Sequence, residues 1–443
     1  MTRHAASAVS VLTGLRRWAV LAPAFAAFML WPLWYRFPDT PGLATSYYFM
    51  RFAFALPAGI AVLAWVFGGF CGFRALIAAR TGRAFAAFLL ALALWSYLST
   101  SWAFRREADP QLALGASMQL SSAILFALAV TSTRMPPRII TLALFAGALW
   151  HVALVGQQVA LQGSAGGIWS SLGEFPISLD QARISVVQAE GIRLLRPYGL
   201  LPHPNLLAGY LVAAVLASAS WLIHRRLPLI VSLTAGAAVL WAFLLTFSRG
   251  AYLGFGAGAL TLLVLTLRSP DVDRHRIATL GAWTVIIAVA FAAVYQPFLL
   301  ARAGVGVETT EQYSAAERSE LNAAALIVIA EHPFTGVGAG NLPWRSAAVL
   351  NERGSIVQGN YPHNIVLSIA GEYGLVGVAL FAGAVAAGLA GSLRGRYTAH
   401  RSALIAGFAA LLLAGQFDYY MVTFMQFQAA SLALIGAALA DRK

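Results

Sequence analysis

The sequence predicts an all-α integral membrane protein with about twelve transmembrane helices. Of its 443 residues, 59% are hydrophobic and only 11% are charged, whereas soluble domains carry about 25% charged residues. The apolar residues also gather in long runs, and a run of about 20 residues crosses roughly 30 Å of hydrocarbon as a helix. Composition and arrangement together exclude a water-soluble enzyme.

Twelve such runs follow one another along the chain. Their approximate limits are 18–35, 47–70, 84–102, 111–132, 138–161, 205–223, 228–247, 250–267, 277–299, 363–391, 402–416 and 420–440. The first run follows Arg16 and Arg17, as a secretory signal would, but eleven later runs favour a retained first helix. We therefore treat residues 1–443 as a single polytopic membrane domain.

The basic residues predict the orientation of the chain. If the N-terminus lies in the cytoplasm, cytoplasmic segments hold 18 basic and three acidic residues, and the other side holds 12 basic and 14 acidic residues. Cytoplasmic loops are enriched in Lys and Arg, so both termini are expected to be cytoplasmic. The positive charges are spread between apolar runs and form no basic patch, which argues against a nucleic-acid partner.

This topology places two long loops on the outer side, residues 162–204 before span six and residues 300–362 between spans nine and ten. The cytoplasmic turns are only a few residues long, so any chemistry is expected at the outer face. The second loop contains a predicted helix from Tyr313 to Ala330, which either lies on the membrane surface or forms a buried lid. Its apolar face would consist of Ala316, Leu321, Ala324, Ile327 and Val328.

Four segments at the outer face combine polar side chains with turn residues. They are Arg193–Asn205, Thr246–Ala251, His332–Asn341, and Tyr361–Asn364 with its continuation to Gly377. Arg196 and Arg249 stand out because an arginine at membrane depth costs about 2.5–3.5 kcal/mol and usually has a partner or an anionic ligand. Two guanidinium forks would suit a diphosphate. Alternatively, Arg249 caps a turn and meets lipid phosphate.

Two histidines precede predicted helix starts in these segments. His203 and His363 each come one or two residues before an asparagine, and we predict Asn205 and Asn364 as N-caps. The positive end of a helix favours an anion and disfavours imidazolium. Either histidine would then stay neutral near pH 7 and could act as a general base. A structural role for each is the alternative.

The sequence offers little for metal or nucleotide chemistry. Cys71 is the only cysteine, and no Cys/His cluster is present. Asp271-Val-Asp273 falls in a cytoplasmic turn, so Asp39 in the first outer loop is the alternative acid for metal-dependent glycosyl transfer. The cluster Gly336, Gly338 and Gly340 lacks a P-loop lysine and is predicted to allow a close turn beside the site.

At this point the sequence resembles the superfamily of O-antigen ligases, O-antigen polymerases and bacterial O-oligosaccharyltransferases. The resemblance covers roughly residues 190–380 and depends on the order of all its motifs. They are Arg196-Pro-Tyr-Gly with His203-Pro-Asn205, Ser248-Arg249-Gly250, Pro333 to Gly340, and Pro362-His363-Asn364 followed by Glu372-Tyr-Gly374. The first five spans match the superfamily only in being hydrophobic.

The resemblance implies a GT-C class glycosyltransferase in the bacterial inner membrane. Such an enzyme transfers a glycan from undecaprenyl diphosphate at the periplasmic face, with inversion and without a metal or other cofactor. Carried over by motif, Arg196 and Arg249 would bind the diphosphate and His363 would be the general base. Further substrate-binding candidates, chosen for closeness to the motifs or position on the loop helix, are His203, Asn205, Arg318, Tyr361 and Asn364.

Within the superfamily the plan of spans and loops is most similar to that of the ligases, whose acceptor is a sugar hydroxyl of lipid A-core. An O-antigen polymerase and a protein O-oligosaccharyltransferase remain alternatives. A transporter or flippase with twelve spans is the alternative of another class. Such transporters often join two similar halves by a longer central link, which here would be only His224 to Leu227.

Overall fold

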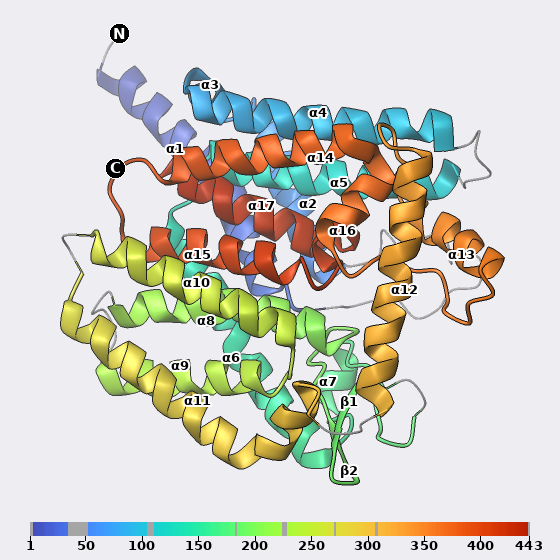
Figure 1. The fold of residues 1–443 in the computed structure, drawn as a ribbon. Coiled ribbons are helices and arrows are strands. Elements are labelled where there is room, and N and C mark those ends of the chain that lie inside the picture. The colour runs from blue at the N-terminus through green and yellow to red at the C-terminus, as the bar shows by residue number, and fades with distance from the viewer. Residues whose placement is uncertain are drawn as a thin grey trace.

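The computed structural model describes residues 3–33, 52–103, 110–181, 184–223, 228–269, 272–305 and 309–441. Asp39, the link from His224 to Leu227, and Asp271 lie outside these ranges. Within them the chain forms a bundle of α-helices with one short β-hairpin (Figure 1). The elements are α1 (Arg3–Met29), α2 (Phe52–Phe67), α3 (Phe73–Ala78), α4 (Arg80–Ala103), α5 (Pro110–Ser132), α6 (Pro137–Leu161), α7 (Ile168–Ser171), β1 (Val186–Ala189), β2 (Ile192–Leu195), α8 (Pro204–Ile223), α9 (Leu229–Leu244), α10 (Arg249–Leu267), α11 (Arg274–Arg302), α12 (Thr309–Glu331), α13 (Leu342–Glu352), α14 (Ile365–Ser392), α15 (Ala399–Ala414), α16 (Tyr420–Thr423) and α17 (Met425–Ala440).

One principal helix overlaps each predicted apolar run, although α1 begins at Arg3, well before its predicted start at residue 18. The principal helices are α1, α2, α4, α5, α6, α8, α9, α10, α11, α14, α15 and α17. In the described ranges, seven helices are long and apolar enough to cross a membrane, namely α4, α5, α6, α8, α10, α11 and α14. Shorter apolar helices lie in α2, α9, α15 and α17. The predicted multi-span helical architecture agrees with this, and the number of twelve spans stays a prediction.

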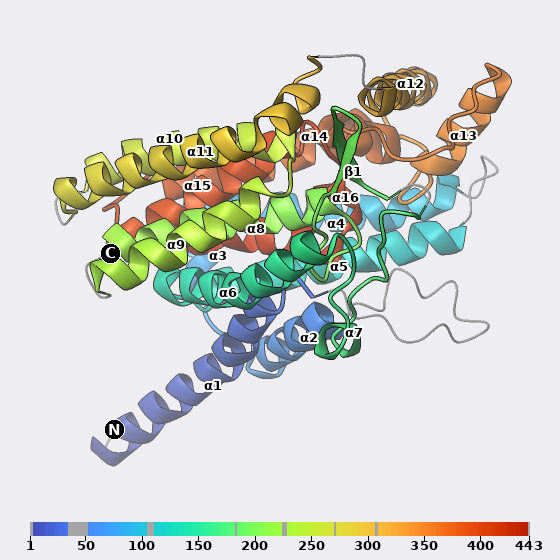
Figure 2. The same cartoon turned by 90° about the horizontal axis from the view of Figure 1, so that it is seen from below.

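Most helices run along one common direction, and both termini lie at the same end of the bundle (Figure 1). We call this the terminal end. At the opposite end α12 lies across the bundle at a steep angle, and Figure 2 shows it almost end-on. Elements α7, β1, β2 and α13 lie at that end too, which we call the loop end.

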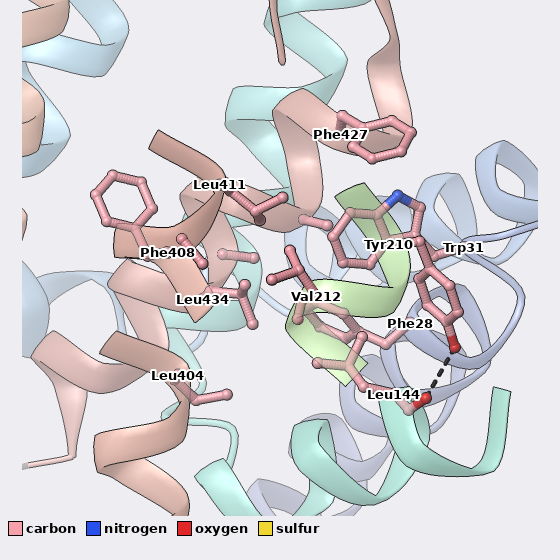
Figure 3. Packing of buried hydrophobic residues seen from close by; sticks show 14 of the residues in the cluster. Phe28, Trp31, Leu144, Tyr210, Val212, Leu404, Phe408, Leu411, Phe427 and Leu434 are labelled. Carbon is pink, nitrogen blue, oxygen red and sulfur yellow. Dashed lines mark hydrogen bonds between the residues drawn. The ribbon is translucent and has the colours of Figure 1, made fainter. Parts of the chain in front are cut away.

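The core centres on α8, in which every residue except Trp221 is buried. Figure 3 shows how its Tyr210 joins neighbouring helices: Trp31 packs edge-on against Tyr210 and Phe427, with ring centroids 5.4 and 5.2 Å apart. The Tyr210 hydroxyl donates to the Leu144 carbonyl of α6 at 2.8 Å. A helix that is apolar on all sides is buried on all sides, and α8 therefore carries its N-terminal end into the centre of the loop end.

Arginines at the terminal end donate to carbonyls at or after the C-terminal ends of helices. Arg17 reaches the carbonyls of Thr133 and Arg134 after α5, at 3.0 and 2.9 Å. The fully buried Arg401 donates to Ala438 of α17 at 3.0 Å and to two carbonyls that follow α14. The last four carbonyls of a helix lack intrahelical partners and carry the negative end of its dipole. Of these acceptors only Ala438 lies in the last turn of a helix, and the others lie in the turns after α5 and α14. These arginines, predicted as cytoplasmic charges, therefore fix the turns that follow the helices.

The loop 162–204 contains a β-hairpin that the sequence analysis did not predict. Strands β1 and β2 pair antiparallel from Val186↔Leu195 to Ala189↔Ile192. Glu190 and Gly191 form the two-residue turn with φ of 52° and 78°, as a type I′ turn requires. Asn-Gly and Asp-Gly are the usual signals for this turn, so Glu-Gly was a weak one. The hairpin leads directly into Arg196.

Helix α12 packs its apolar face against protein at the loop end. Leu321, Ala324 and Val328 form a hydrophobic cluster that is separate from the main core. The other members of this cluster are Val337, Leu342, Val349, Leu350 and Tyr361. Ala316, predicted on the same face, is exposed, because α12 extends past its contacts toward its N-terminus. The helix thus lies across the end of the bundle and covers the segment that leads to His363.

Helix α14 is broken at Gly374, whose φ of 66° and ψ of −170° are not helical. A break inside a membrane-spanning helix leaves carbonyls without intrahelical donors, and these must find other partners. The amides of Val337 and Gly338 donate to the carbonyls of Gly371 and Glu372, both at 2.9 Å. The Trp95 indole donates to Tyr373 at 2.9 Å. The loop 333–341 therefore completes the hydrogen bonding of the broken helix.

The glycines of this loop allow the close approach that the sequence analysis predicted. A Cβ on Gly336 would lie 2.4 Å from the Glu372 carbonyl carbon, and one on Gly374 would lie 2.2 Å from that of Phe334. Both glycines have φ near +65°, which side chains disfavour. The two backbones can meet only because neither residue has a side chain.

Replacing Gly374 with alanine is expected to lower the stability of the protein severely. The left-handed φ alone costs about 1–2 kcal/mol, and contact with the Phe334 backbone adds to this. Gly256→Ala in α10 is the matched control, because nothing lies within 4 Å of its added Cβ and alanine favours a helix by roughly 0.5–1 kcal/mol. Thermal unfolding in detergent checks both variants. Equal midpoints would contradict the close contact.

Candidate functional site

A polar pocket at the loop end collects side chains from five separate parts of the chain. Its charged and polar lining consists of Asn205, Ser248, Arg249, Arg302, Arg318 and Asp418, and Gly250, Ala251, Ala414, Phe417 and Tyr420 complete it. Of the predicted site residues, Arg249, Arg318 and Asn205 meet here. Arg302 and Asp418 had not been predicted.

Arg196 lies behind this pocket and does not line it. The residue is 5% exposed. Its Nε donates to the Thr246 carbonyl at 2.7 Å, and one terminal nitrogen donates to Asn205 Oδ1 at 2.6 Å. Arg196 thus connects the segment after the hairpin to the end of α9 and to the start of α8.

Asn205 bridges two charged groups. While its Oδ1 accepts from Arg196, its Nδ2 donates to Asp418 Oδ2 at 2.7 Å. The prediction that Asn205 is an N-cap was wrong, because α8 begins at Pro204 and the amide of Asn205 donates to His203 Nδ1 at 3.1 Å. His203 supplies the cap, and the Asn205 side chain is left to link Arg196 with Asp418.

Arg249 and Arg302 each donate a hydrogen bond to a backbone carbonyl, and these bonds join the end of α11 to the turn before α10. Arg249 donates to the Arg302 carbonyl at the end of α11 at 2.8 Å, and Arg302 Nε donates to the Phe247 carbonyl at 3.1 Å. Phe247 has a φ of 48°, so the chain turns sharply between α9 and α10. These bonds fix two guanidinium groups beside the N-terminal end of α10, where Ser248, Gly250 and Ala251 also line the pocket. Arginines and a helix N-terminus both favour an anion.

His203 is half-buried, and its ring nitrogens bond to protein atoms. Its Nδ1 accepts from the Asn205 amide, so in the neutral ring Nε2 carries the proton and donates to Ser185 Oγ at 3.0 Å. Burial, aided by Arg196 nearby, holds the pKa of His203 well below its ordinary value. The ring therefore stays neutral, as predicted, but both nitrogens have protein partners.

His363 is only half-buried and faces the same region. Its ring and that of Tyr419 are 5.0 Å apart between centroids and inclined at 63°, and the Phe417 backbone lies near the ring. Within the described part of the chain, its Nδ1 has no hydrogen-bond partner. Burial lowers the pKa of His363, the negative charge of Asp418 opposes this shift, and the positive charge of Arg318 adds to it. The lowered pKa keeps the ring neutral near pH 7, and Asp418 and Arg318 are the charged side chains that act on it.

Asn364 caps α14 as predicted. Its Oδ1 accepts from the amides of Val366 and Leu367 at 2.9 and 3.0 Å. These two amides, at the helix end that was predicted to favour an anion, therefore bond to Asn364 instead. The Ile365 amide donates to the Gly415 carbonyl at 2.8 Å, which ties the start of α14 to the turn that carries Asp418.

Tyr361 is packed inside the protein, although it was predicted as a substrate contact. It is 9% exposed, and its hydroxyl donates to Glu372 Oε1 at 2.5 Å. Its ring stacks on Tyr419 with centroids 5.7 Å apart. The residue therefore braces the segment that carries His363.

The comparison with known families agrees with these motifs. A family model described as O-antigen ligase matches residues 234–382. The match confirms the resemblance and includes Arg249, Arg302, Arg318 and His363, whereas Arg196 and Asp418 lie outside it. No curated protein matches the chain.

Asn205→Ala is expected to destabilise the protein because it removes the bridge between buried Arg196 and Asp418. A hydrogen bond to a charged group contributes roughly 1.5–3 kcal/mol, and two such bonds are lost. Asn351→Ala on the exposed part of α13 is the control. Thermal unfolding in detergent measures the difference, and equal midpoints would show that the bridge does not support the fold.

Proposed function

We propose that this member of the O-antigen ligase family transfers a glycan from undecaprenyl diphosphate to a sugar hydroxyl of lipid A-core, at the periplasmic face of a bacterial inner membrane. The observation that carries the proposal is the pocket of Arg249, Arg302 and Arg318 beside the half-buried base His363. The family match supports the reaction class. The donor, the acceptor and the orientation in the membrane belong to the proposal.

The three arginines suit the leaving group. With Asp418 as the acid of the pocket lining, they leave an excess of positive charge that a diphosphate would balance. Guanidinium forks match phosphate oxygens and are always charged. As the sugar–oxygen bond breaks, negative charge grows on the diphosphate, and fixed donors stabilise that charge without reorganisation. Arg196, predicted as a direct ligand, would act here by holding Asn205.

His363 would remove the proton of the acceptor. The acceptor oxygen attacks the anomeric carbon while the bond to the diphosphate breaks, and the hydroxyl proton moves to the imidazole of His363. Asp418 stabilises the imidazolium that forms. Attack opposite the leaving group inverts the anomeric configuration. A positioned base contributes about 10²–10⁴-fold in rate.

The alternatives differ in the acceptor. An O-antigen polymerase or a protein O-oligosaccharyltransferase would use the same donor pocket and the same base. The transporter alternative has less support, because the arginines and His363 lie at one end of the bundle and the chain matches an enzyme family.

Transfer in proteoliposomes tests the proposal. Wild type and His363→Ala are given undecaprenyl diphosphate glycan with EDTA, and rough lipopolysaccharide, a second lipid-linked glycan or an acceptor protein is supplied in turn. Glycosylated lipopolysaccharide from wild type, reduced about 10²–10⁴-fold in the variant, supports a metal-independent ligase. Longer lipid-linked glycans or glycosylated protein would instead identify one of the alternatives. No product with any acceptor would refute glycosyl transfer.

Arg249→Lys is expected to lower kcat/KM by about 10²-fold, the effect of losing one fixed donor to a developing oxyanion. Lysine keeps the charge but loses the fork and the bond to the Arg302 carbonyl. Arg353→Lys, at an exposed position after α13, is the matched control and should leave the rate unchanged. Near-normal transfer by Arg249→Lys would refute diphosphate clamping.

The pH dependence of transfer follows from the pKa of His363. Only the neutral ring is a base, and its lowered pKa keeps it neutral further into acid. The acid limb of kcat/KM should therefore lie below pH 6.5, the ordinary histidine value. Asp418→Asn removes the charge that raises this pKa, so the limb should move to still lower pH. Rate profiles of wild type, Asp418→Asn and the exposed control Glu352→Gln measure this, and an unmoved limb in Asp418→Asn would contradict the assignment.

A further inference from the structure

We propose that Tyr361 and Glu372 form a positioning pair that fixes His363 relative to Arg318. The inference rests on the proposed function, in which His363 is the base and Arg318 binds the donor. Neither member of the pair touches substrate in this account. Their contacts connect the two elements that carry those groups.

The ring of Tyr361 belongs to the hydrophobic cluster beneath α12, with Leu321 and Val328. Its hydroxyl donates a hydrogen bond to Glu372 of α14. Tyr361 also lies only two residues before His363. A movement of α12, which carries Arg318, would therefore be transmitted to His363 through this side chain.

One carboxyl oxygen of Glu372 accepts hydrogen bonds both from Tyr361 and from the loop 333–341. Its Oε1 accepts from Tyr361 and also from the Gly340 amide, at 2.8 Å, in the loop that follows α12. The residue is 2% exposed and lies just before the break at Gly374. A buried carboxyl group needs hydrogen-bond partners, so its position is set by the loop and the tyrosine together.

Tyr419 carries the constraint to the imidazole ring. It stacks on Tyr361 at an interplanar angle of 30° and contacts His363 at 63°. Asn360 Nδ2 donates to the Tyr419 hydroxyl at 3.4 Å. The histidine is thus held by the chain through Tyr361 and by packing through Tyr419.

Kinetics separate positioning from simple support of the fold. Tyr361→Phe keeps the ring and loses the hydrogen bond, and we expect kcat to fall about tenfold, since a small misplacement of a reacting group is costly. Glu372→Leu should lose about 10²-fold. Glu372→Gln should recover most of the rate, because an amide oxygen still accepts both bonds. Donor KM should stay within about twofold in Tyr361→Phe and Glu372→Gln, because Arg249 and Arg302 still line the donor pocket.

Matched controls and a double-mutant cycle complete the kinetic test. Tyr313→Phe, at a 74% exposed position of α12, should leave kcat unchanged. In a His363→Ala background, Tyr361→Phe should cause no further loss, since the pair acts through the histidine. Normal kcat in Tyr361→Phe, no recovery in Glu372→Gln, or additive losses in the cycle would each overturn the proposal.

A distance measurement tests the pair without activity. Spin labels are placed on cysteines at Ala316 of α12 and Val366 of α14, both exposed, after Cys71→Ser. Glu372→Leu should broaden the distance distribution between the labels, whereas Tyr313→Phe should not. An unchanged distribution in Glu372→Leu overturns the proposal even if wild type transfers normally. Absence of transfer by wild type with a broadened distribution would instead refute the function and keep the pair.

Discussion

A guanidinium group held away from water needs hydrogen-bond acceptors, and this protein supplies them from the carbonyls at the ends of its helices. At the terminal end Arg401 takes carbonyls that follow α14 and the end of α17. At the loop end Arg196 and Arg302 take the carbonyls of Thr246 and Phe247 that follow α9. Because these carbonyls lack intrahelical donors, one bond satisfies both groups. The same bonding that joins the ends of the helices therefore also fixes the arginines that we place around the donor.

At the break in α14 the buried groups that need partners are carbonyls, and other parts of the chain supply the donors. Gly374 interrupts the helix and exposes carbonyls, and the donors come from the loop after α12 and from Trp95. The loop is thereby bound to α14 along several bonds. As a result, the half of α14 that begins beside His363 and the helix that carries Arg318 are parts of one hydrogen-bonded unit.

The helical architecture was readable from the sequence because the apolar runs are local and strong, and the Asn364 cap follows from a local pattern as well. Asn205 failed as a cap because His203, two residues earlier, offers a ring nitrogen in the same place. Arg302 resembled an ordinary basic residue at a helix end, and its hydrogen bonds with Phe247 and Arg249 distinguish it. Asp418 had a usable signal, since an acid between two apolar spans is costly and often functional. Pairing across 50 or more residues could not be read locally.

The separate hydrophobic cluster beneath α12 has a consequence for how the surface of the loop end can vary. Its members come from α12, α13 and the segment up to Tyr361, apart from the main core. Substitutions on the exposed faces of α12 and α13 therefore alter the surface at the loop end without repacking the spans. The shape and charge of the loop end can therefore change while the packing of the long helices stays the same.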